Sequence, residues 1–293
     1  MHSGEMMEAR TTWPRSSREG AVERFYSHGV NGETDIHRGF LNFGLWERSI
    51  ADYVAAAENL VSRLGTMLGL DSGARLLDVA CGMGSQDVHL QRTFGPLEID
   101  GLDVTWQHVE RARQRAQDEA LDDRLRFHHG TATALPFAAG AFTHLMSIEG
   151  PEHFDTRRSF FEEAIRVLRP GGVMCLADYT VNARPRNVLE RTVFGVVLRM
   201  WKVPSENVWN AGEYREQLQA AGFHDVTLDH VGPLTFPGYY REQCRPAFRA
   251  EMRRLQGPLI ERLGHLINVM TNRAYEMGLI DYVLVRAVKP ALG

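Results

Sequence analysis

The stretch LLDVACGMGSQDVHL, residues 76–90, is the part of the chain that decides its fold class. Its apolar first half is typical of a buried strand, Gly82-Met83-Gly84 forms a turn, and a helical pattern follows. Glycines in such a turn adopt backbone angles that other residues avoid, and they let a ligand approach the backbone closely. The helix after the turn presents free N–H groups at its start. The stretch therefore predicts a strand–loop–helix unit whose loop binds a ligand.

The residues in and around this loop favour one kind of ligand over two common ones. A dinucleotide-binding loop carries a third glycine, and the chain has Asp87 at that position. The Gly-Lys-Ser/Thr pattern of ATP-binding loops is missing from the sequence. Asp78 stands near the strand end, where a carboxylate suits an ammonium group better than phosphates. Asp103 ends the next apolar run, about 20 residues beyond the loop, where an acid can accept hydrogen bonds from ribose hydroxyls. These residues predict a nucleoside with an amino-acid tail.

Short apolar runs alternate with helical patterns on both sides of this unit. Such alternation predicts an α/β protein, with a Rossmann-like, mostly parallel sheet and helices on both faces. The expected strands cover 75–80, 99–104, 125–128, 141–147, 173–179, 226–231 and 281–288. The expected helices cover 21–26, 49–69, 86–94, 107–120, 156–168 and 213–221.

The segments outside this alternation suggest a division of the chain into a core and a lid. Late excursions are expected to cover the carboxyl ends of the strands, where open α/β sheets bind ligands. The expected parts are a disordered tail (1–20), an N-terminal helical lid (21–70), the ligand-binding core (71–181), lid and substrate insertions (182–211 and 233–278), and two segments that complete the sheet (212–232 and 279–293).

Composition limits the function classes. The formal net charge of −4 over 293 residues provides no footprint for nucleic acid. No apolar run approaches the ~20 residues of a membrane span, so we expect no membrane partner. Three widely spaced cysteines fit neither a disulfide framework nor a metal site, which favours the cytoplasm and no bound metal. The sequence leaves the oligomeric state open, with a homodimer as one candidate.

Taken together, the motifs resemble the class I S-adenosylmethionine (SAM) dependent methyltransferases. The match rests on LDVACGMGSQ, GLDVT, GTATALPF with AFTHLMSIE, RVLRPGG and the final DYVLVRAV. Within that class, LNFGLWE and EHFDTR look like the natural-product O-methyltransferases of the rebeccamycin and erythromycin sugar type. The resemblance implies a seven-stranded sheet with an antiparallel last strand, SAM as cofactor, and a small-molecule acceptor from secondary metabolism, such as antibiotic biosynthesis.

The same resemblance implies a set of cofactor-binding residues. Those expected at the methionine part are Asp78, Gly82 and Gly84, with Asp103 at the ribose, Thr131 and Ala132 beside the adenine, and Ala80, Val104 and Ile148 in the same set. Tyr26 and Trp46 are expected to close over the cofactor with a π face toward the sulfonium, the alternative being simple packing of the lid. One departure is plain. Thr131 stands where the family usually has an Asp that binds the adenine amino group, so that hydrogen bond must come from the Thr hydroxyl, the backbone or water.

Methyl transfer to a hydroxyl also requires removal of a proton. His153 is the candidate general base, because an imidazole has a suitable pKa and the residue follows the fourth expected strand. Asp178, at the end of the fifth strand, is expected to orient His153 or the acceptor hydroxyl, or else simply to cap the strand. Glu149 and Glu152 are alternative bases, suited to proton removal from carbon, although a solvated loop is the plainer interpretation of Glu152.

The lid segments leave the acceptor open. The segment 239–254 is rich in arginine, which is typical of a solvated helix face or, alternatively, of a grip on an anionic acceptor such as a prenyl diphosphate. Aromatic residues in the lid suggest an apolar acceptor cavity. The leading hypothesis is O-methylation with a His base. The alternatives are C- or N-methylation on the same scaffold, for example of a prenyl diphosphate or an alkaloid-like acceptor, and, more distantly, a Rossmann-type oxidoreductase or a non-catalytic binder.

Overall fold

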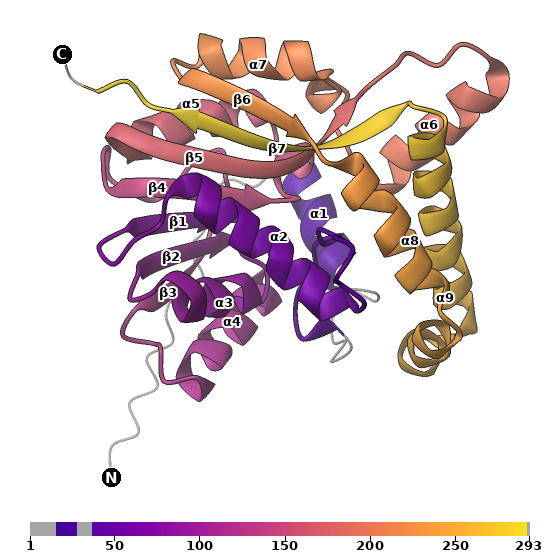
Figure 1. Cartoon of the computed structure of the whole chain (residues 1–293), viewed down its shortest axis with the longest axis horizontal. Coiled ribbons are helices and arrows are strands. Elements are labelled where there is room, and N and C mark those ends of the chain that lie inside the picture. The colour runs from indigo at the N-terminus through magenta and orange to yellow at the C-terminus, as the bar shows by residue number, and fades with distance from the viewer. Residues whose placement is uncertain (1–15, 28–36, 292–293) are drawn as a thin grey trace.

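A seven-stranded sheet forms the centre of the molecule, as a computed structural model shows for residues 16–27 and 37–291 (Figure 1). The strands are β1 (Arg75–Val79), β2 (Glu98–Asp103), β3 (Leu125–His129), β4 (Phe142–Ile148), β5 (Leu168–Val181), β6 (His224–His230) and β7 (Ile280–Val288). Their order is β3-β2-β1-β4-β5-β7-β6, and β7 runs antiparallel to both of its neighbours. The expected fold class and the antiparallel last strand are therefore confirmed.

Helices cover both faces of the sheet. One face carries α2 (Tyr53–Leu68), α3 (Ser85–Phe94) and α4 (Trp106–Asp118), and the other carries α5 (Arg157–Val167) and α7 (Ala211–Ala220) (Figure 1). Side chains alternate between the faces along each strand. In β1, Leu76 packs into the apolar cluster under α2 and α3, and Leu77 packs into the cluster under α5 and α7. Because β1 to β5 run parallel, their carboxyl ends meet at one edge of the sheet.

A second group of helices stands beyond the carboxyl ends of the strands. It consists of α6 (Val188–Met200), α8 (Phe236–Cys244) and α9 (Pro246–Glu276), which pack on one another at one side of the molecule (Figure 1). The long α9 is broken at Gly257, where φ is 83° and ψ is 164°, and Pro258 follows. Among the short 3₁₀ turns, η2 (Pro151–His153) follows β4, η3 (Ser205–Asn207) lies between α6 and α7, and η4 (Gly232–Leu234) joins β6 to α8.

The N-terminal boundary differs from our expectation. Residues 17–20 were expected in a disordered tail, yet they form the first turn of α1 (Ser17–Ser27). The reason is a reciprocal cap: the Glu19 N–H donates to the Ser16 hydroxyl at 3.1 Å, and the Ser16 N–H donates to the Glu19 carboxylate at 3.0 Å. The rest of the expected tail, 1–15, lies outside the described residues.

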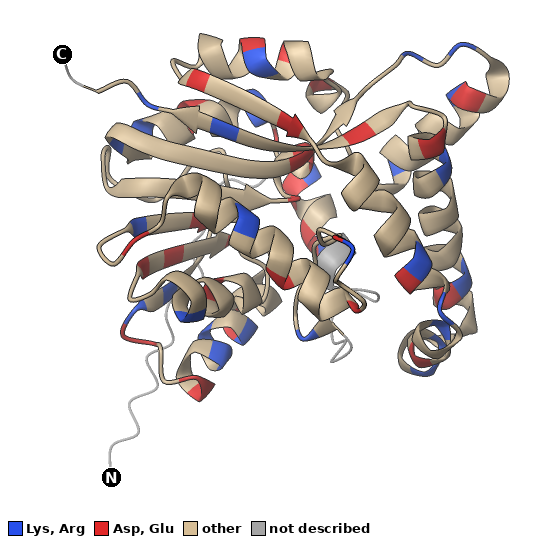
Figure 2. Ribbon diagram, viewed as in Figure 1, with Lys and Arg blue, Asp and Glu red and all other residues tan. Residues whose placement is uncertain are grey.

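Charge is distributed without a single-sign surface in the view of Figure 2, where basic and acidic residues are interspersed along the helices. Among the described residues, no helix is both long and apolar enough to cross a bilayer. In the same part of the chain, no group of three or more His, Cys, Asp or Glu side chains is placed to hold a metal ion.

Candidate active site

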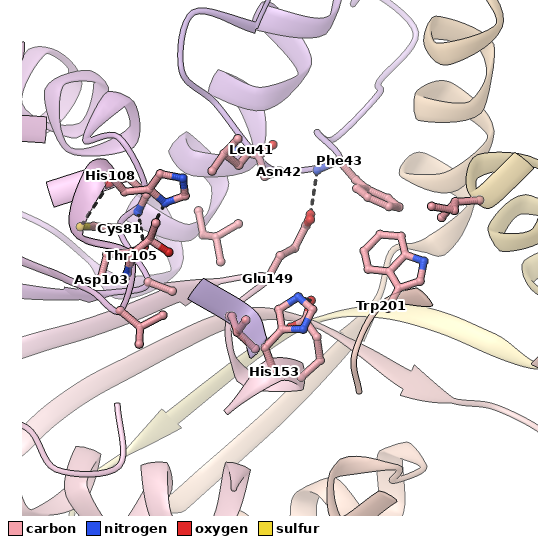
Figure 3. Close-up of a pocket in the computed structure, with 18 of the residues that line it drawn as sticks. Leu41, Asn42, Phe43, Cys81, Asp103, Thr105, His108, Glu149, His153 and Trp201 are labelled. Atoms are coloured by element: carbon pink, nitrogen blue, oxygen red, sulfur yellow. Dashed lines mark hydrogen bonds and ion pairs between the residues drawn. The ribbon is translucent and has the colours of Figure 1, made fainter. Parts of the chain in front are cut away.

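One large cavity, of about 340 Å³, opens at the carboxyl ends of β1 to β4 and extends under the lid helices. Most of the residues expected in the site meet there. The wall includes Ala80, Gly82, Asp103, Val104, Thr131, Ala132, Ile148, Glu149 and His153. Figure 3 shows Asp103 and His108 at one end of this cavity, and Glu149, His153 and Trp201 toward the other. Of the expected residues that the structure describes, Asp78, Gly84, Asp178 and Trp46 do not line it.

The glycine loop approaches the cavity at Gly82 but not at Gly84. A Cβ on Gly82, whose φ is 57°, would lie 3.3 Å from the nearest Leu41 methyl. A Cβ on Gly84, whose φ is 74°, would lie 3.0 Å from side-chain atoms of both Ala112 and Phe127. Gly84 therefore permits close packing of the loop against α4 and β3, and its expected contact with the ligand stays a prediction.

Asp78 lies behind the loop. It is fully buried and accepts a hydrogen bond from the Gln86 amide at 2.5 Å. Burial raises the pKa of Asp78 to about 7, and burial with the Asp78 charge raises the pKa of Asp87 well above its ordinary value. The neighbouring Gln86 lines the cavity instead. Asp78 thus contacts the cavity wall through Gln86, and its expected contact with an ammonium group stays a prediction. The sequence analysis missed Gln86, although it stands two residues after Gly84.

Asp103 is held as an ionised acceptor at the end of β2. Its carboxylate accepts the Gly82 N–H at 3.0 Å and the Thr105 N–H at 2.8 Å, and His108 Nδ1 lies 3.5 Å away. Burial by itself raises the pKa of Asp103, but His108 and the two N–H donors outweigh it and leave the pKa below its ordinary value. A carboxylate has about four acceptor sites, so Asp103 retains capacity for ribose hydroxyls. His108 was not anticipated from the sequence.

Thr131 and Ala132 lie at the end of β3, where the adenine was expected. The Thr131 hydroxyl donates a hydrogen bond to the carboxylate of Glu19, which reaches the cavity from α1. The sequence analysis missed Glu19 because it placed this residue in a disordered tail. The Ser16–Glu19 spacing, which is that of a helix cap, was the signal that could have identified it.

His153 lines the cavity from the turn η2. Its side chain is 6% exposed, and the Glu152 carboxyl lies 3.7 Å from Nε2. Burial is the main cause that lowers the pKa of His153 to about 4, against smaller effects of Asp178 and of a hydrogen bond to the Trp201 main chain, which raise it. The imidazole is therefore neutral at pH 7 and able to accept a proton.

Glu152 is not a solvated loop residue. It is fully buried, and its pKa is raised well above the ordinary value, first by burial and then by the charges of Asp178 and Glu149. Burial thus favours the neutral, protonated form of this carboxyl, which suits a neutral imidazole as its neighbour.

Glu149 occupies a strained position at the end of β4. Its φ is 52°, and its Oε1 accepts the Phe43 N–H at 2.7 Å and the Tyr282 hydroxyl at 2.7 Å. Burial raises the pKa of Glu149 to about 7, although these hydrogen bonds oppose the rise. Strain in a residue that lines a cavity is typical of a functional site. Glu149 therefore remains a candidate proton acceptor.

Asp178 lies behind η2 and not in the cavity. The Arg157 guanidinium donates to its Oδ1 at 2.7 Å, and the Tyr214 hydroxyl donates to its Oδ2 at 2.8 Å. Both Asp178 and Arg157 are buried, so their charges compensate each other. Asp178 therefore does not line the cavity, and its expected role in orienting His153 or the acceptor hydroxyl stays a prediction.

Asn207, in the turn η3, clamps the turn that carries His153. Its amide donates to the carbonyls of Glu152 at 3.1 Å and Phe154 at 2.8 Å, and it accepts the Arg157 N–H at 2.9 Å. Sequence reasoning missed both Asn207 and Arg157. Their contact joins positions 50 residues apart, and no local pattern signals it.

The aromatic lid residues divide into two groups. Trp46 packs against Gly238 of α8, where a Cβ would lie 2.0 Å from its ring, and its Nε1 donates to the Phe43 carbonyl at 2.9 Å. This contact agrees with the packing alternative, and the expected contact of Trp46 with the cofactor stays a prediction. Phe43 and Tyr239 do line the cavity, with stacked rings 4.0 Å apart. The side chain of Tyr26 lies outside what the structure describes.

Most arginines of the segment 239–254 pair with glutamates. Arg249 and Arg253 both contact Glu261, at 2.6 and 3.1 Å, and Arg245 contacts Glu242 at 2.9 Å. Basic and acidic segments accordingly adjoin along this end of α9 in Figure 2. The positive charge that binding of a diphosphate would need is therefore largely compensated by glutamates of the lid itself.

Comparison with known proteins agrees with this geometry. A family model described as a methyltransferase domain matches residues 76–172. The erythromycin 3''-O-methyltransferase of Saccharopolyspora erythraea is 30% identical, and the match covers 88% of this chain and 86% of that protein. The 27-O-demethylrifamycin SV methyltransferase of Amycolatopsis mediterranei is 28% identical, over 85% of this chain and 90% of that one.

Solved structures share the fold. The cyclase SpnF superposes with a TM-score of 0.76 at 23% identity, covering 95% of this chain and 99% of the other. The geranyl diphosphate C-methyltransferase of Streptomyces coelicolor, solved with S-adenosyl-L-homocysteine, superposes with a TM-score of 0.72 at 20% identity, covering 94% and 100%. At these identities the likeness supports the fold alone.

Proposed function

This chain belongs to the SAM-dependent methyltransferases, and from that premise we propose that it methylates a hydroxyl group of a small organic molecule, with His153 as general base. The observation that carries the proposal is the state of His153. The imidazole lines the cavity, is nearly shielded from bulk water and has a pKa of about 4, so it is unprotonated at neutral pH. Both curated relatives described above are named for methyl transfer to oxygen-bearing antibiotics.

The residues at the nucleoside end fit the family cofactor. Gly82 leaves room where a Cβ would approach Leu41, and Asp103 is an ionised acceptor that still has free acceptor capacity. We assign Asp103 to the ribose, Gln86 and the backbone around Gly82 to the methionine part, and Ala132 to the adenine. When bound, SAM supplies an electrophilic methyl group on a positively charged sulfur.

The chain's own contribution to the chemistry is to position an acceptor and take its proton. His153 receives the proton from the hydroxyl as the oxygen attacks, and its contact with the Trp201 main chain fixes the ring orientation. The nearby negative charge of Asp178 favours the imidazolium that forms, which Arg157 partly offsets. Asn207 and Arg157 act as positioning residues, since they hold the turn η2 in place.

The lid side of the cavity indicates the kind of acceptor. Its apolar wall includes Trp201, Phe248 and Ile260, and a polar pair, in which the Asn268 amide donates to the Gln243 carbonyl at 3.0 Å, interrupts it. A neutral molecule with an apolar body and several hydroxyls suits this wall better than a diphosphate, because the lid arginines are already paired. We propose an antibiotic-like secondary metabolite as acceptor.

C-methylation is the second candidate function, and Glu149 is the observation that favours it. A carboxylate with a pKa of about 7 on the cavity wall is a stronger base than His153 and suits removal of a proton from carbon. The two candidates predict different products. Mass spectrometry and NMR of the methylated product will show whether the new methyl group is bonded to oxygen or to carbon.

The proposal is tested by methyl transfer from labelled SAM to a panel of hydroxylated macrolide and ansamycin acceptors. For His153→Ala we expect turnover to fall at least about a hundredfold, the size of general-base assistance, with S-adenosylhomocysteine (SAH) affinity within about threefold. His265→Ala is the matched control, because that histidine also lines the cavity but from α9, so it should change KM more than turnover. Unchanged turnover of His153→Ala would remove the imidazole from the mechanism.

We propose further that the protein acts in the cytoplasm on a small molecule and has no nucleic-acid partner. Cys81 and Cys175 are buried free thiols, which suits a reducing compartment. The net charge of −4 and the mixed surface charges disfavour nucleic acid. A homodimer is testable by sedimentation velocity, where a mass near twice the 33.1 kDa of the chain would support it.

A further inference from the structure

The order of the strands places the base of the nucleoside near β3. Asp103, assigned to the ribose, ends β2, and the next strand outward from β1 and β2 is β3. The residues that follow β3 on the cavity wall are Gly130, Thr131 and Ala132. A base attached to that ribose, on the side away from the β1 loop, must therefore lie beside these three residues.

An adenine in that place brings an amino group that needs an acceptor. A buried donor left without a partner loses about 1–3 kcal/mol of binding free energy. Ala132 has no side-chain acceptor. The Thr131 hydroxyl, which donates to Glu19, already accepts the Thr133 N–H at 3.3 Å and lies 3.1 Å from the Thr133 hydroxyl. The carboxylate of Glu19 lines this part of the cavity together with Val22, and both come from α1.

Glu19 is held in this position from several directions. Its Oε1 accepts the Thr131 hydroxyl and lies 3.5 Å from the Thr133 hydroxyl, and its Oε2 accepts the Ser16 N–H at 3.0 Å. The preceding residue, Arg18, forms ion pairs with Asp155, a cavity-lining residue after η2, at 3.1 Å and with the exposed Glu206 at 2.9 Å. We call α1 the strap, because Glu19 holds it at the end of β3 and Arg18 holds it near η2 and η3.

We propose that Glu19 is the acceptor for the exocyclic amino group of the adenine, and that Thr131 orients its carboxylate. Each carboxylate oxygen has two acceptor sites, so the existing contacts leave capacity for an N–H donor. A base with an oxygen at the same position would set a lone pair against the carboxylate and would be rejected. Glu19 thereby determines the specificity for adenine from a segment 112 residues before Thr131.

The test compares two ligands that differ only in the base. Calorimetry measures the affinity for SAH and for S-inosylhomocysteine, whose hypoxanthine carries oxygen in place of the amino group. For the native chain we expect SAH to bind at least about tenfold more tightly, as a hydrogen bond to a charged group implies. Glu19→Ala should bring the two affinities within about twofold of each other. Glu19→Ala combined with Thr131→Asp should restore the preference, because it returns a carboxylate to the same place.

Two controls separate recognition of the amine from folding of the helix. Glu23→Gln removes a carboxylate of the same helix that does not line the cavity, and it should retain the native preference. Arg18→Ala removes the ion pairs that hold the strap near η2 and η3, and it should lower the affinity for both ligands by the same factor. The proposal would be overturned if Glu19→Ala still bound SAH more tightly than S-inosylhomocysteine by the native ratio, including the case in which both affinities fall by the same factor. It would also be overturned if the native chain bound the two ligands equally. No acceptor is present in these measurements, so the outcome does not depend on which atom is methylated.

Discussion

Replacing Glu149 by Gln should make the ligand-free protein more stable at pH 8 than the native chain. The Glu149 carboxyl is enclosed at the end of β4, and burial raises its pKa from 4.5 to about 7. Between these two values the folded protein binds more protons at this site than the unfolded chain does. Stability is therefore lost as the pH rises from about 4.5 to 7, and above pH 7 the whole penalty of the buried charge is present.

The size of the effect follows from the same values. A pKa displaced from 4.5 to about 7 corresponds to about 3 kcal/mol of unfolding free energy, at about 1.4 kcal/mol for each pH unit. Glu149→Gln keeps an oxygen that can accept the Phe43 N–H and the Tyr282 hydroxyl, and it carries no charge at any pH. We expect the variant to gain about 2–3 kcal/mol on the native chain between pH 5 and pH 8.

Urea denaturation at pH 5, 6, 7 and 8 measures this difference directly. Other buried acids contribute the same pH dependence to both proteins, so the difference between them isolates Glu149. Glu216→Gln, an exposed glutamate on α7, is the matched control and should follow the native curve. Parallel curves for Glu149→Gln and the native chain would refute the reasoning, because they would show that the carboxyl titrates equally in the folded and unfolded states.

Further predictions concern the loop and the clamp. Gly84→Ala should lower the unfolding free energy by about 2–3 kcal/mol, because its methyl would lie 3.0 Å from side chains of α4 and β3 at a φ of 74°. It should change SAH affinity less than Gly82→Ala does. Gly82→Ala, whose nearest contact is at 3.3 Å, should lose about 1–2 kcal/mol of stability but bind SAH at least about tenfold more weakly. If calorimetry showed that Gly84→Ala weakens SAH binding more than Gly82→Ala, the packing argument would be contradicted. Asn207→Ala removes four side-chain hydrogen bonds around the turn η2, so urea denaturation should show a loss of about 3 kcal/mol of unfolding free energy. Turnover should fall while SAH affinity is retained. Native turnover in that variant would show that the clamp does not position His153.

The features of the fold and the site that could be predicted from the sequence are those that depend on residues close together in the chain. The strand–loop–helix unit around Gly82 is one, since an apolar run, a turn and a helix start are signalled by neighbouring residues. The positions of Asp103, Thr131 and His153 followed in the same way, because each stands just after a strand of a parallel sheet and those strand ends share one edge.

What the sequence by itself determined, then, is the fold class and the edge at which the site is built. Only the tertiary structure decided which side chains face the cavity and in what protonation state. It placed Asp78 and Asp178 behind the wall, brought Glu19 to it across 112 residues, and brought Asn207 across 50 residues to the turn η2 that carries His153. Enclosure in the same buried layer also favours the neutral forms of His153 and Glu152, since it lowers the pKa of the first and raises the pKa of the second. The physical reason is that burial and long-range contact depend on how the layers pack, and no local pattern of residues encodes that packing.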